Sequence, residues 1–168
     1  MKRFILAAIV AICSVTASAF VADVLEWTVG TQLVYGTEGN MPGAGLHFKT
    51  HYLDSWRTAL SGNYYFEKNG VSCFDVNLEC NYLFNVGEKI QLYPLVGGCA
   101  AIWRQSDTDV DGWRFESGDK THYEIGLNVG GGIDYLLGEH WLINAEVKYR
   151  FMKNADQVLF GVGVGFRF

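Results

Sequence analysis

Hydrophobic and polar side chains alternate strictly along the last eleven residues of the chain. From position 158 to position 168, Val or Phe occupies every even position, whereas Gly, Leu or Arg occupies every odd position. Such period-two alternation predicts a β-strand whose two faces meet different surroundings. The pattern recurs along the rest of the chain, so we predict eight strands. They cover approximately residues 27–35, 43–52, 56–67, 73–84, 89–103, 123–137, 141–151 and 158–168.

The connections between these segments alternate between short and long. Residues 53–55, 85–88 and 138–140 read as tight turns, whereas residues 37–42, 68–72, 104–120 and 153–156 are mostly longer loops. This alternation of short and long connections predicts consecutive antiparallel hairpins. An even number of strands places both ends of the chain beside the short turns. Pro94 cannot donate a main-chain hydrogen bond, so we expect a bulge or a change of parity near it.

Side-chain size indicates which rows of residues point inward. The apolar rows contain more large aromatic rings than the narrow interior of an eight-stranded barrel can hold, whereas the opposite rows contain Gly, Ala, Ser, Asn and charged residues. We therefore predict an all-β, eight-stranded antiparallel up-and-down transmembrane β-barrel with a polar lumen. Ion pairs are expected to plug this lumen, and a narrow conducting path is the alternative. The predicted lumen network comprises Lys49, Arg57, Glu67, Asp75, Glu79, Glu124, Asp134, Glu146, Lys148, Arg150 and Arg167.

The N-terminus has the features of an export signal. Lys2 and Arg3 precede an apolar run, and Ala17-Ser18-Ala19 matches a cleavage site. We expect residues 1–19 to be removed and residues 20–168 to form one barrel domain. No later stretch is long and apolar enough for a membrane-spanning helix. The net charge of −5 argues against a nucleic-acid partner.

Several segments carry a family resemblance. These are the segments Tyr93-Pro94-Leu95-Val96-Gly97-Gly98, residues 128–135, residues 144–149 and the terminal Gly-Phe-Arg-Phe. The chain resembles small outer-membrane β-barrels of the OmpA-like, OmpX-like or opacity-protein type, which are often grouped as porin-family proteins. The resemblance implies a monomer in the lipid of a bacterial outer membrane, with an unidentified extracellular partner. It also implies that Phe166 and Phe168 form a signal for the barrel-assembly machinery.

The long loop contains half of a calcium-binding motif. Asp107, Asp109 and Asp111 follow the D-x-D-x-D-G pattern, in which alternate carboxylates converge on a cation. Position twelve of the motif is Gly118, so the bidentate Glu is missing. Calcium and a solvated acidic loop therefore remain alternatives, and no other cofactor is expected.

Two cysteines fall on the predicted lumen rows. If the fourth and fifth segments pair around Val86, Cys73 and Cys99 lie opposite one another and could form a cross-strand disulfide. Free buried thiols are the alternative.

The sequence favours a non-enzymatic structural or surface-interaction role. His122 and His140 fall at opposite ends of the predicted barrel, and neither has a neighbouring Ser that would suggest a catalytic set. The exposed loops form the contact surface, with Trp103, Trp113 and Phe115 as expected anchors. A small passive pore, a lipid-modifying outer-membrane enzyme and a soluble lipocalin-like carrier are the competing hypotheses.

Overall fold

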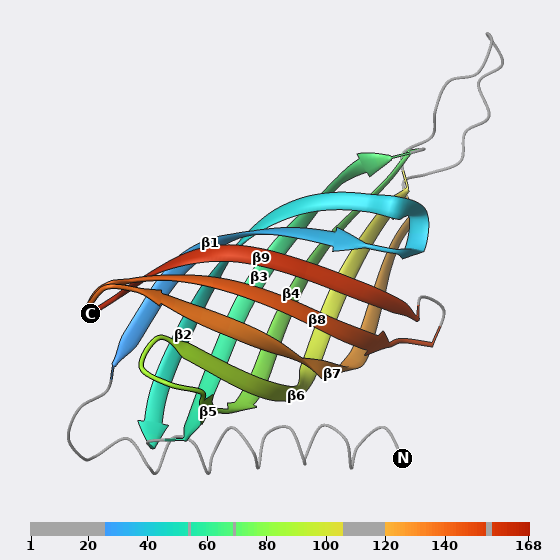
Figure 1. The fold of residues 1–168 in the computed structure, drawn as a ribbon. Helices are drawn as coiled ribbons and strands as arrows, with labels where there is room; N and C mark the ends of the chain where they lie inside the picture. The colour runs from blue at the N-terminus through green and yellow to red at the C-terminus, as the bar shows by residue number, and fades with distance from the viewer. Residues whose placement is uncertain (1–25, 54, 69, 106–119, 154–155) are drawn as a thin grey trace, which may run out of the picture.

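Antiparallel strands make up almost all of the part of the chain that the structure describes (Figure 1). The computed structural model describes residues 26–53, 55–68, 70–105, 120–153 and 156–168. A short 3-10 helix, η1 (Glu38–Asn40), joins the first two strands. The strands within the described ranges are β1 (Trp27–Gly36), β2 (Met41–Leu53), β3 (Trp56–Lys68), β4 (Val71–Tyr82), β5 (Phe84–Asn85), β6 (Ile90–Gln105), β7 (Lys120–Leu137), β8 (Trp141–Phe151) and β9 (Gln157–Arg167).

The strands close into a barrel with eight positions. The hydrogen-bonded order is β4-β3-β2-β1-β9-β8-β7-β6-β5, and β4 also pairs with β6, which closes the sheet. The two-residue β5 continues β4 along the same neighbour, β6, so the two occupy one position of the barrel. All pairings are antiparallel, which confirms the predicted eight-stranded up-and-down barrel.

The two ends of the barrel differ. β1 begins and β9 ends at one end, which we call the turn end, and the β4–β6 and β7–β8 connections lie there too. Gly87 and Gly138 in these two connections have φ angles of 85° and 86°, a conformation that glycine adopts without strain. The opposite end, which we call the loop end, carries the connections β1–β2, β3–β4, β6–β7 and β8–β9.

The expected irregularity near Pro94 takes a different form from the one predicted. β6 pairs with β7 in continuous register from Ile90 to Gln105, so the expected bulge or parity change within β6 is wrong. The irregularity instead affects the other neighbour of β6. Its pairing stops at Asn81 of β4 and resumes at Phe84 of β5.

Hydrogen-bond direction explains this placement. The N–H of Leu136 donates to the carbonyl of Lys89 across the start of the β6–β7 ladder. Main-chain groups alternate in direction along a strand, so odd-numbered residues of β6 face β7 and even-numbered residues face β4 and β5. The missing N–H of Pro94 therefore lies on the β4 and β5 side, where the pairing is interrupted.

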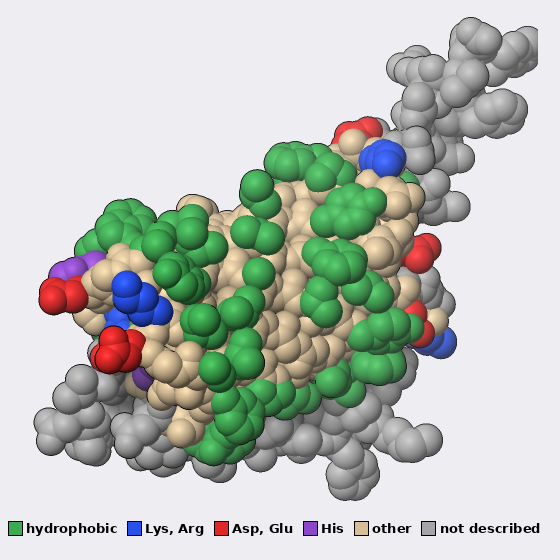
Figure 2. Space-filling view, viewed as in Figure 1, with side chains coloured by type: hydrophobic (Ala, Val, Ile, Leu, Met, Phe, Trp, Pro, Cys, Tyr) green, Lys and Arg blue, Asp and Glu red, His purple; other side chains and the backbone are tan. Residues whose placement is uncertain are grey.

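The apolar rows point outward and the polar rows point inward. In β1 the side chains alternate between exposed and buried along the whole strand, starting with exposed Trp27. On the face that Figure 2 shows, hydrophobic side chains spread over the barrel wall and charged groups gather toward its two ends. A lipocalin-like carrier would bury its apolar rows inside, so that alternative is wrong. No helix in the described ranges is both long and apolar enough to cross a membrane.

The interior contains polar and apolar layers. Charged and amide side chains fill its centre, as the next section describes. A smaller apolar cluster joins Leu83, Tyr93 and Leu95. Toward the loop end lies a larger apolar cluster, which we call the apolar layer: Val34, Met41, Tyr65, Cys73, Cys99, Ala101, Met152 and Leu159, with Trp103 packed against it.

Candidate functional site in the barrel interior

The centre of the lumen contains equal numbers of buried positive and negative side chains. They come from inward-facing positions of β2, β3, β4, β7 and β8, because every second residue of a strand points to the same face. Four cations and four anions are joined by ion pairs, so the cluster is formally neutral. We call it the lumen network: Lys49, Arg57, Lys148 and Arg150 with Asp75, Glu79, Asp134 and Glu146.

The part of the network nearest the turn end is built around Asp134. Its carboxylate pairs with the guanidinium of Arg57, and its Oδ1 lies 3.6 Å from Lys49 Nζ. The same Lys49 Nζ lies 3.3 Å from Glu146 Oε1. β2, β3, β7 and β8 thus meet through side chains across the lumen.

The aromatic ring of Tyr93 lies against the cations of this group. Its hydroxyl donates a 2.8 Å hydrogen bond to Glu146 Oε1. The Arg57 guanidinium lies 4.5 Å, and the Lys49 ammonium 5.5 Å, from the centre of its ring. The ring occupies the space beside Gly132, where a Cβ atom would meet Tyr93 Cζ at 2.5 Å. A cation over an aromatic face gains electrostatic stabilisation, so Tyr93 contributes both a hydrogen bond and two cation–π contacts.

The middle of the network joins β8 to β4. Lys148 Nζ lies 2.7 Å from Glu79 Oε1 and 3.9 Å from Glu146 Oε2. Asn128 Nδ2 donates a 2.8 Å hydrogen bond to the same Glu79 oxygen. Glu146 therefore connects this pair to the Asp134 group, because it contacts both lysines.

The part of the network nearest the loop end is an Arg–Asp pair surrounded by amides. Arg150 Nη2 lies 2.6 Å from Asp75 Oδ2 and donates a 2.8 Å hydrogen bond to Asn77 Oδ1. Asn63 and Asn77 both donate to Asp75 Oδ1 at 2.8 Å. Arg150 Nε donates to Asn128 Oδ1 at 3.2 Å. Buried charges are tolerated when they are paired and hydrogen-bonded, and these contacts pair Arg150 with Asp75 while leaving Arg150 Nη1 without a hydrogen-bond partner among the described residues.

Three of the predicted lumen residues lie outside the lumen network. Glu67 is exposed near the loop end of β3, where the alternating pattern ends, so its lumen placement is wrong. Arg167 pairs with Glu26 at the turn end and is partly exposed. Glu124 is buried, but it lies near the loop end, with its Oε1 3.1 Å from Nε2 of the exposed His122.

The amide side chains and Tyr93 take part in the lumen contacts, although the predicted network named charged residues only. Asn63, Asn77 and Asn128 bridge the charged groups, and Gln32 donates to Asn63 Oδ1 at 2.6 Å. All of them occupy inward positions of the alternating pattern, so their parity was the available signal. The predicted network followed charge and therefore omitted these uncharged side chains.

The cysteine register differs from the predicted one. Cys73 lies opposite Trp103 and Cys99 lies opposite Asn77, so the two are four residues out of register. At roughly 3.3 Å per residue this separates them by about 13 Å along the strands, beyond the reach of a disulfide. Both are free and buried. The turn is centred at Glu88, with the Val86 N–H donating to the Ile90 carbonyl, and this shift moves the register.

The expected loop anchors and calcium ligands have different outcomes. Trp103 faces inward from β6 and packs against the apolar layer, so its expected role as an exposed anchor is wrong. Trp113, Phe115, Asp107, Asp109 and Asp111 lie outside the described residues. Within the described ranges, no group of three or more His, Cys, Asp and Glu side chains could hold a metal ion.

The remaining candidate residues lie at the two ends of the barrel. His122 is near the loop end, whereas His140 stacks on Phe166 at the turn end, with ring centres 5.5 Å apart. Phe166 also contacts Phe168 at 5.0 Å. The Phe168 N–H donates to the Trp27 carbonyl at 2.8 Å, which fixes the end of β9 against β1. Recognition of these phenylalanines by the assembly machinery stays a prediction.

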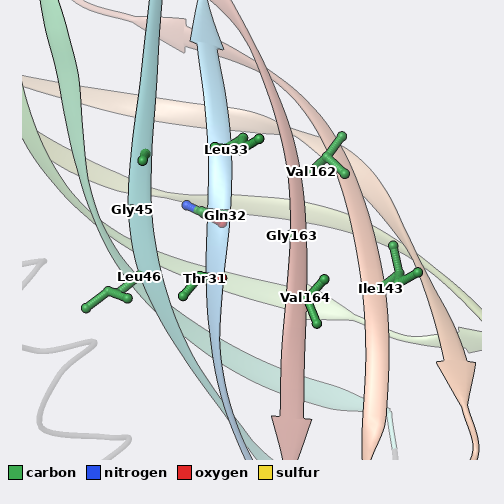
Figure 3. A pocket seen from close by; sticks show the side chains of 10 residues that line it. Thr31, Gln32, Leu33, Gly45, Leu46, Ile143, Val162, Gly163 and Val164 are labelled. Carbon is green, nitrogen blue, oxygen red and sulfur yellow. The ribbon is translucent and has the colours of Figure 1, made fainter.

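A shallow groove of about 750 Å³ lies on the outside of β1, β2, β8 and β9 (Figure 3). Leu33, Leu46, Val162 and Val164 line it, around the smaller Thr31. The groove is apolar and belongs to the outward face of the strands. It is therefore separate from the polar interior.

The barrel is similar to outer-membrane proteins of known family and structure. A family model described as "Outer membrane protein beta-barrel domain" matches residues 5–168. The N-terminal β-barrel domain of Pseudomonas aeruginosa OprF is similar, with a TM-score of 0.68, 19% identity, and coverage of 85% of this chain and 97% of that chain. The search of curated proteins found no match.

Two further solved structures share the fold. The attachment invasion locus protein of Yersinia pestis, Ail, gives a TM-score of 0.62 with 17% identity over 86% of this chain and 97% of that chain. A major outer membrane protein from Thermus thermophilus gives a TM-score of 0.71 with 11% identity over 87% of this chain and 100% of that chain. At these identities the likeness shows the fold alone.

Proposed function

Because the chain belongs to the outer membrane protein β-barrel domain family, and hence to the bacterial outer membrane, we propose that it is a closed, non-conducting barrel. Its role is structural or surface-directed and non-enzymatic, and it acts through the loop end. In this proposal the loop end faces the outside of the cell, because long loops of such barrels are extracellular and short turns are periplasmic.

One observation carries the closed state: the ion pairs of the lumen network join strands that are not neighbours. Lys148 of β8 contacts Glu79 of β4, and Lys49 of β2 contacts Glu146 of β8. A passing ion would have to separate such pairs. Removing one partner of a buried ion pair costs about 3–5 kcal/mol, because the other charge is left uncompensated.

The apolar layer supports the same proposal. It lies in the lumen on the loop-end side of the Arg150–Asp75 pair and includes the buried side chains of Met41, Tyr65 and Met152. An ion entering from the loop end would lose its hydration among these side chains before it reached a charged partner. The lumen is therefore obstructed by two layers of different chemistry.

The names of two similar proteins agree with a surface role. One is the attachment invasion locus protein of Yersinia pestis and another is Neisserial surface protein A. These names describe those proteins, and the likeness to this chain is one of fold. The surface role here is supported chiefly by an obstructed lumen, which leaves the loop end as the part of the molecule open to partners.

Single-channel recording in planar lipid bilayers tests the closed state. The wild-type protein should give no stable conductance steps. A double variant, Glu79→Ala with Lys148→Ala, removes a cross-lumen pair without leaving an unpaired charge, and should give steps. Glu67→Ala with Lys68→Ala is the matched control, because both residues are exposed near the loop end, and it should stay silent. Steps of equal size in the wild type and the cross-lumen variant would overturn the proposal.

A small passive pore is the second candidate, and one observation favours it. His47 and Asn144 are buried on inward positions toward the turn end, and both polar side-chain atoms of each lack a hydrogen-bond partner among the described residues. Buried polar groups of this kind are usually satisfied by ordered water. Water in this half of the lumen would shorten the obstructed section, and wild-type conductance would then support the pore.

A further inference from the structure

We propose that the apolar layer inside the lumen binds one soft monovalent metal ion of the copper(I) type, held by the sulfur atoms of Cys99 and Met152. The inference goes beyond the proposed surface role and does not depend on whether the barrel conducts. Met41 and Cys73 bring two further sulfur atoms into the same layer. We call these four residues the sulfur group.

The sulfur-containing residues of the chain gather in this one layer. The sequence contains three methionines and four cysteines. Met1 and Cys13 lie outside the described residues, and Cys80 faces outward from β4. All the others belong to the sulfur group, where their exposed fractions are between 2% and 5%. Leu, Val or Ala would fill the same layer equally well, so apolar packing alone does not account for this concentration of sulfur.

Gly126 brings Cys99 and Met152 together. Cys99 of β6 lies directly opposite Gly126 of β7. On the other side of β7, Met152 follows Phe151, which pairs with Leu127. A Cβ atom on Gly126 would meet Met152 Cγ at 2.6 Å and Cys99 Sγ at 3.1 Å, so both side chains lie over the glycine. The methionine sulfur is one bond beyond Cγ on a flexible side chain, so it can reach an ion bound to the thiol.

The chemistry of the layer selects a soft ion. Thiolate and thioether sulfur bind copper(I) and similar soft metals, whereas Ca²⁺ and Mg²⁺ take oxygen ligands. The named members of the apolar layer contain no carboxylate and no imidazole. Within the described ranges, no group of three His, Cys, Asp and Glu side chains could hold a metal ion, so methionine is needed to complete a site here.

Charge balance favours a monovalent ion. The Cys99 thiol loses its proton when it binds the metal, so one thiolate and one copper(I) ion form a neutral unit. The thioether of Met152 adds no charge. A neutral unit is less costly to bury among apolar side chains than a divalent ion, which would leave one positive charge uncompensated. The nearby Asp75 cannot compensate for it, because it is already paired with Arg150.

The bound ion would connect two strands that do not pair with each other. Within the described ranges, β6 and β8 each pair with β7 and are joined only through it. An ion held by Cys99 and Met152 would link β6 to the end of β8 across the lumen face of β7. A ligand that binds only the folded state stabilises that state, so the loaded barrel should resist unfolding better than the unloaded one.

Retention of silver(I) after refolding tests the site. Silver(I) is the probe, because it shares the preference of copper(I) for sulfur and does not oxidise thiols. The protein is refolded from urea into lipid vesicles with excess silver(I), so that the ion can enter before the barrel closes, and a chelator then removes loosely bound ion. About one ion per barrel should remain, and unfolding should need more urea. No retained ion would overturn the proposal.

Matched variants identify the ligands. Met152→Leu keeps the apolar volume and removes the thioether. It should fold and bind silver(I) about 100-fold more weakly or worse, because even the outer partners of a metal contribute up to that factor. Cys99→Ala should abolish retention. Cys80→Ser is the control and should bind as the wild type does, because Cys80 faces outward. Wild-type affinity in Met152→Leu, or equal loss in Cys80→Ser, would overturn the proposal.

X-ray absorption identifies the atoms around the metal. The protein is refolded with copper(I) under anaerobic conditions with ascorbate, and excess ion is removed as before. The spectrum should show sulfur neighbours only, and the sulfur signal should weaken in Met152→Leu. Nitrogen or oxygen neighbours would contradict the assignment, because they would place the ion at a histidine or a carboxylate outside the apolar layer.

Discussion

At the scale of single residues, the lumen is specified by fit as well as by charge. Tyr93 lies under two cations and donates to Glu146, and it fits only because Gly132 has no side chain. Parity in the sequence predicts that Gly132 points inward, whereas the expected change of parity near Pro94 left the side of Tyr93 open. It does not predict that they pack together, because they lie on different strands whose register depends on the intervening chain.

Gly132→Ala should therefore destabilise the barrel. The added methyl group would meet Tyr93 Cζ and Oη at 2.5 Å, so the ring must move away from Glu146 and from Arg57. Overpacking of this kind costs about 1–3 kcal/mol of unfolding free energy. Urea unfolding in lipid vesicles measures it. Gly98→Ala is the control, because nothing lies within 4 Å of the added atom, and an equal loss in both variants would contradict the prediction.

The Arg150–Asp75 pair should contribute more to stability than the Arg167–Glu26 pair. The first pair is completely buried, whereas the partners of the second are 27% and 34% exposed. Asp75→Asn should lower the unfolding free energy by about 3–5 kcal/mol, because Arg150 keeps a buried charge without its carboxylate. Glu26→Gln should cost about 0–1 kcal/mol, since solvent screens that pair. The same urea experiment compares them, and similar losses would contradict the prediction.

At the scale of elements, the sequence predicts the strands better than their register. The alternating segments correspond to the observed strands because lipid-facing and lumen-facing positions impose a period of two. Register depends on turn geometry, and the centre of the β4–β6 hairpin lies at Glu88 instead of Val86. A two-residue shift of the turn moves the strands by four residues, which separated Cys73 from Cys99. The misplacement of Glu67 has a similar cause, because parity does not show at which residue a strand extends past the enclosed lumen into solvent.

Chemical labelling checks this register. The purified protein is unfolded and alkylated without reductant, and its peptides are mapped by mass spectrometry. Both Cys73 and Cys99 should carry the label, because their positions are too far apart for a disulfide. A control sample that is reduced before alkylation should give the same map. A peptide pair that appears only after reduction would contradict the observed register.

At the scale of the whole molecule, two asymmetries run along the barrel axis. The lumen changes from polar at its centre to apolar toward the loop end. On one side of that end, β6 and β7 extend beyond the last residue of β8. The sequence predicts the barrel itself, because outward apolar rows and closure satisfy the same requirement of a bilayer. It does not predict that β6 and β7 extend beyond β8, because that feature depends on unequal strand lengths and on the register between neighbours.

A third asymmetry concerns tryptophan. Trp27, Trp56 and Trp141 each begin a strand at the turn end and face outward, whereas Trp103 faces the lumen near the loop end. Aromatic residues with a polar group prefer the interface between lipid and water. The three outward residues should therefore form one interfacial band.

Depth-dependent quenching tests this arrangement. Variants that retain a single Trp, with the others changed to Phe, are folded into vesicles containing lipids brominated near the headgroup or near the chain end. Trp27, Trp56 and Trp141 should each be quenched more strongly by the shallow bromine, because they lie at the interface. Trp103 should be quenched by neither lipid, because the barrel wall separates it from the chains. Strong quenching of Trp103 by deep bromine would mean that β6 faces the lipid with the opposite parity.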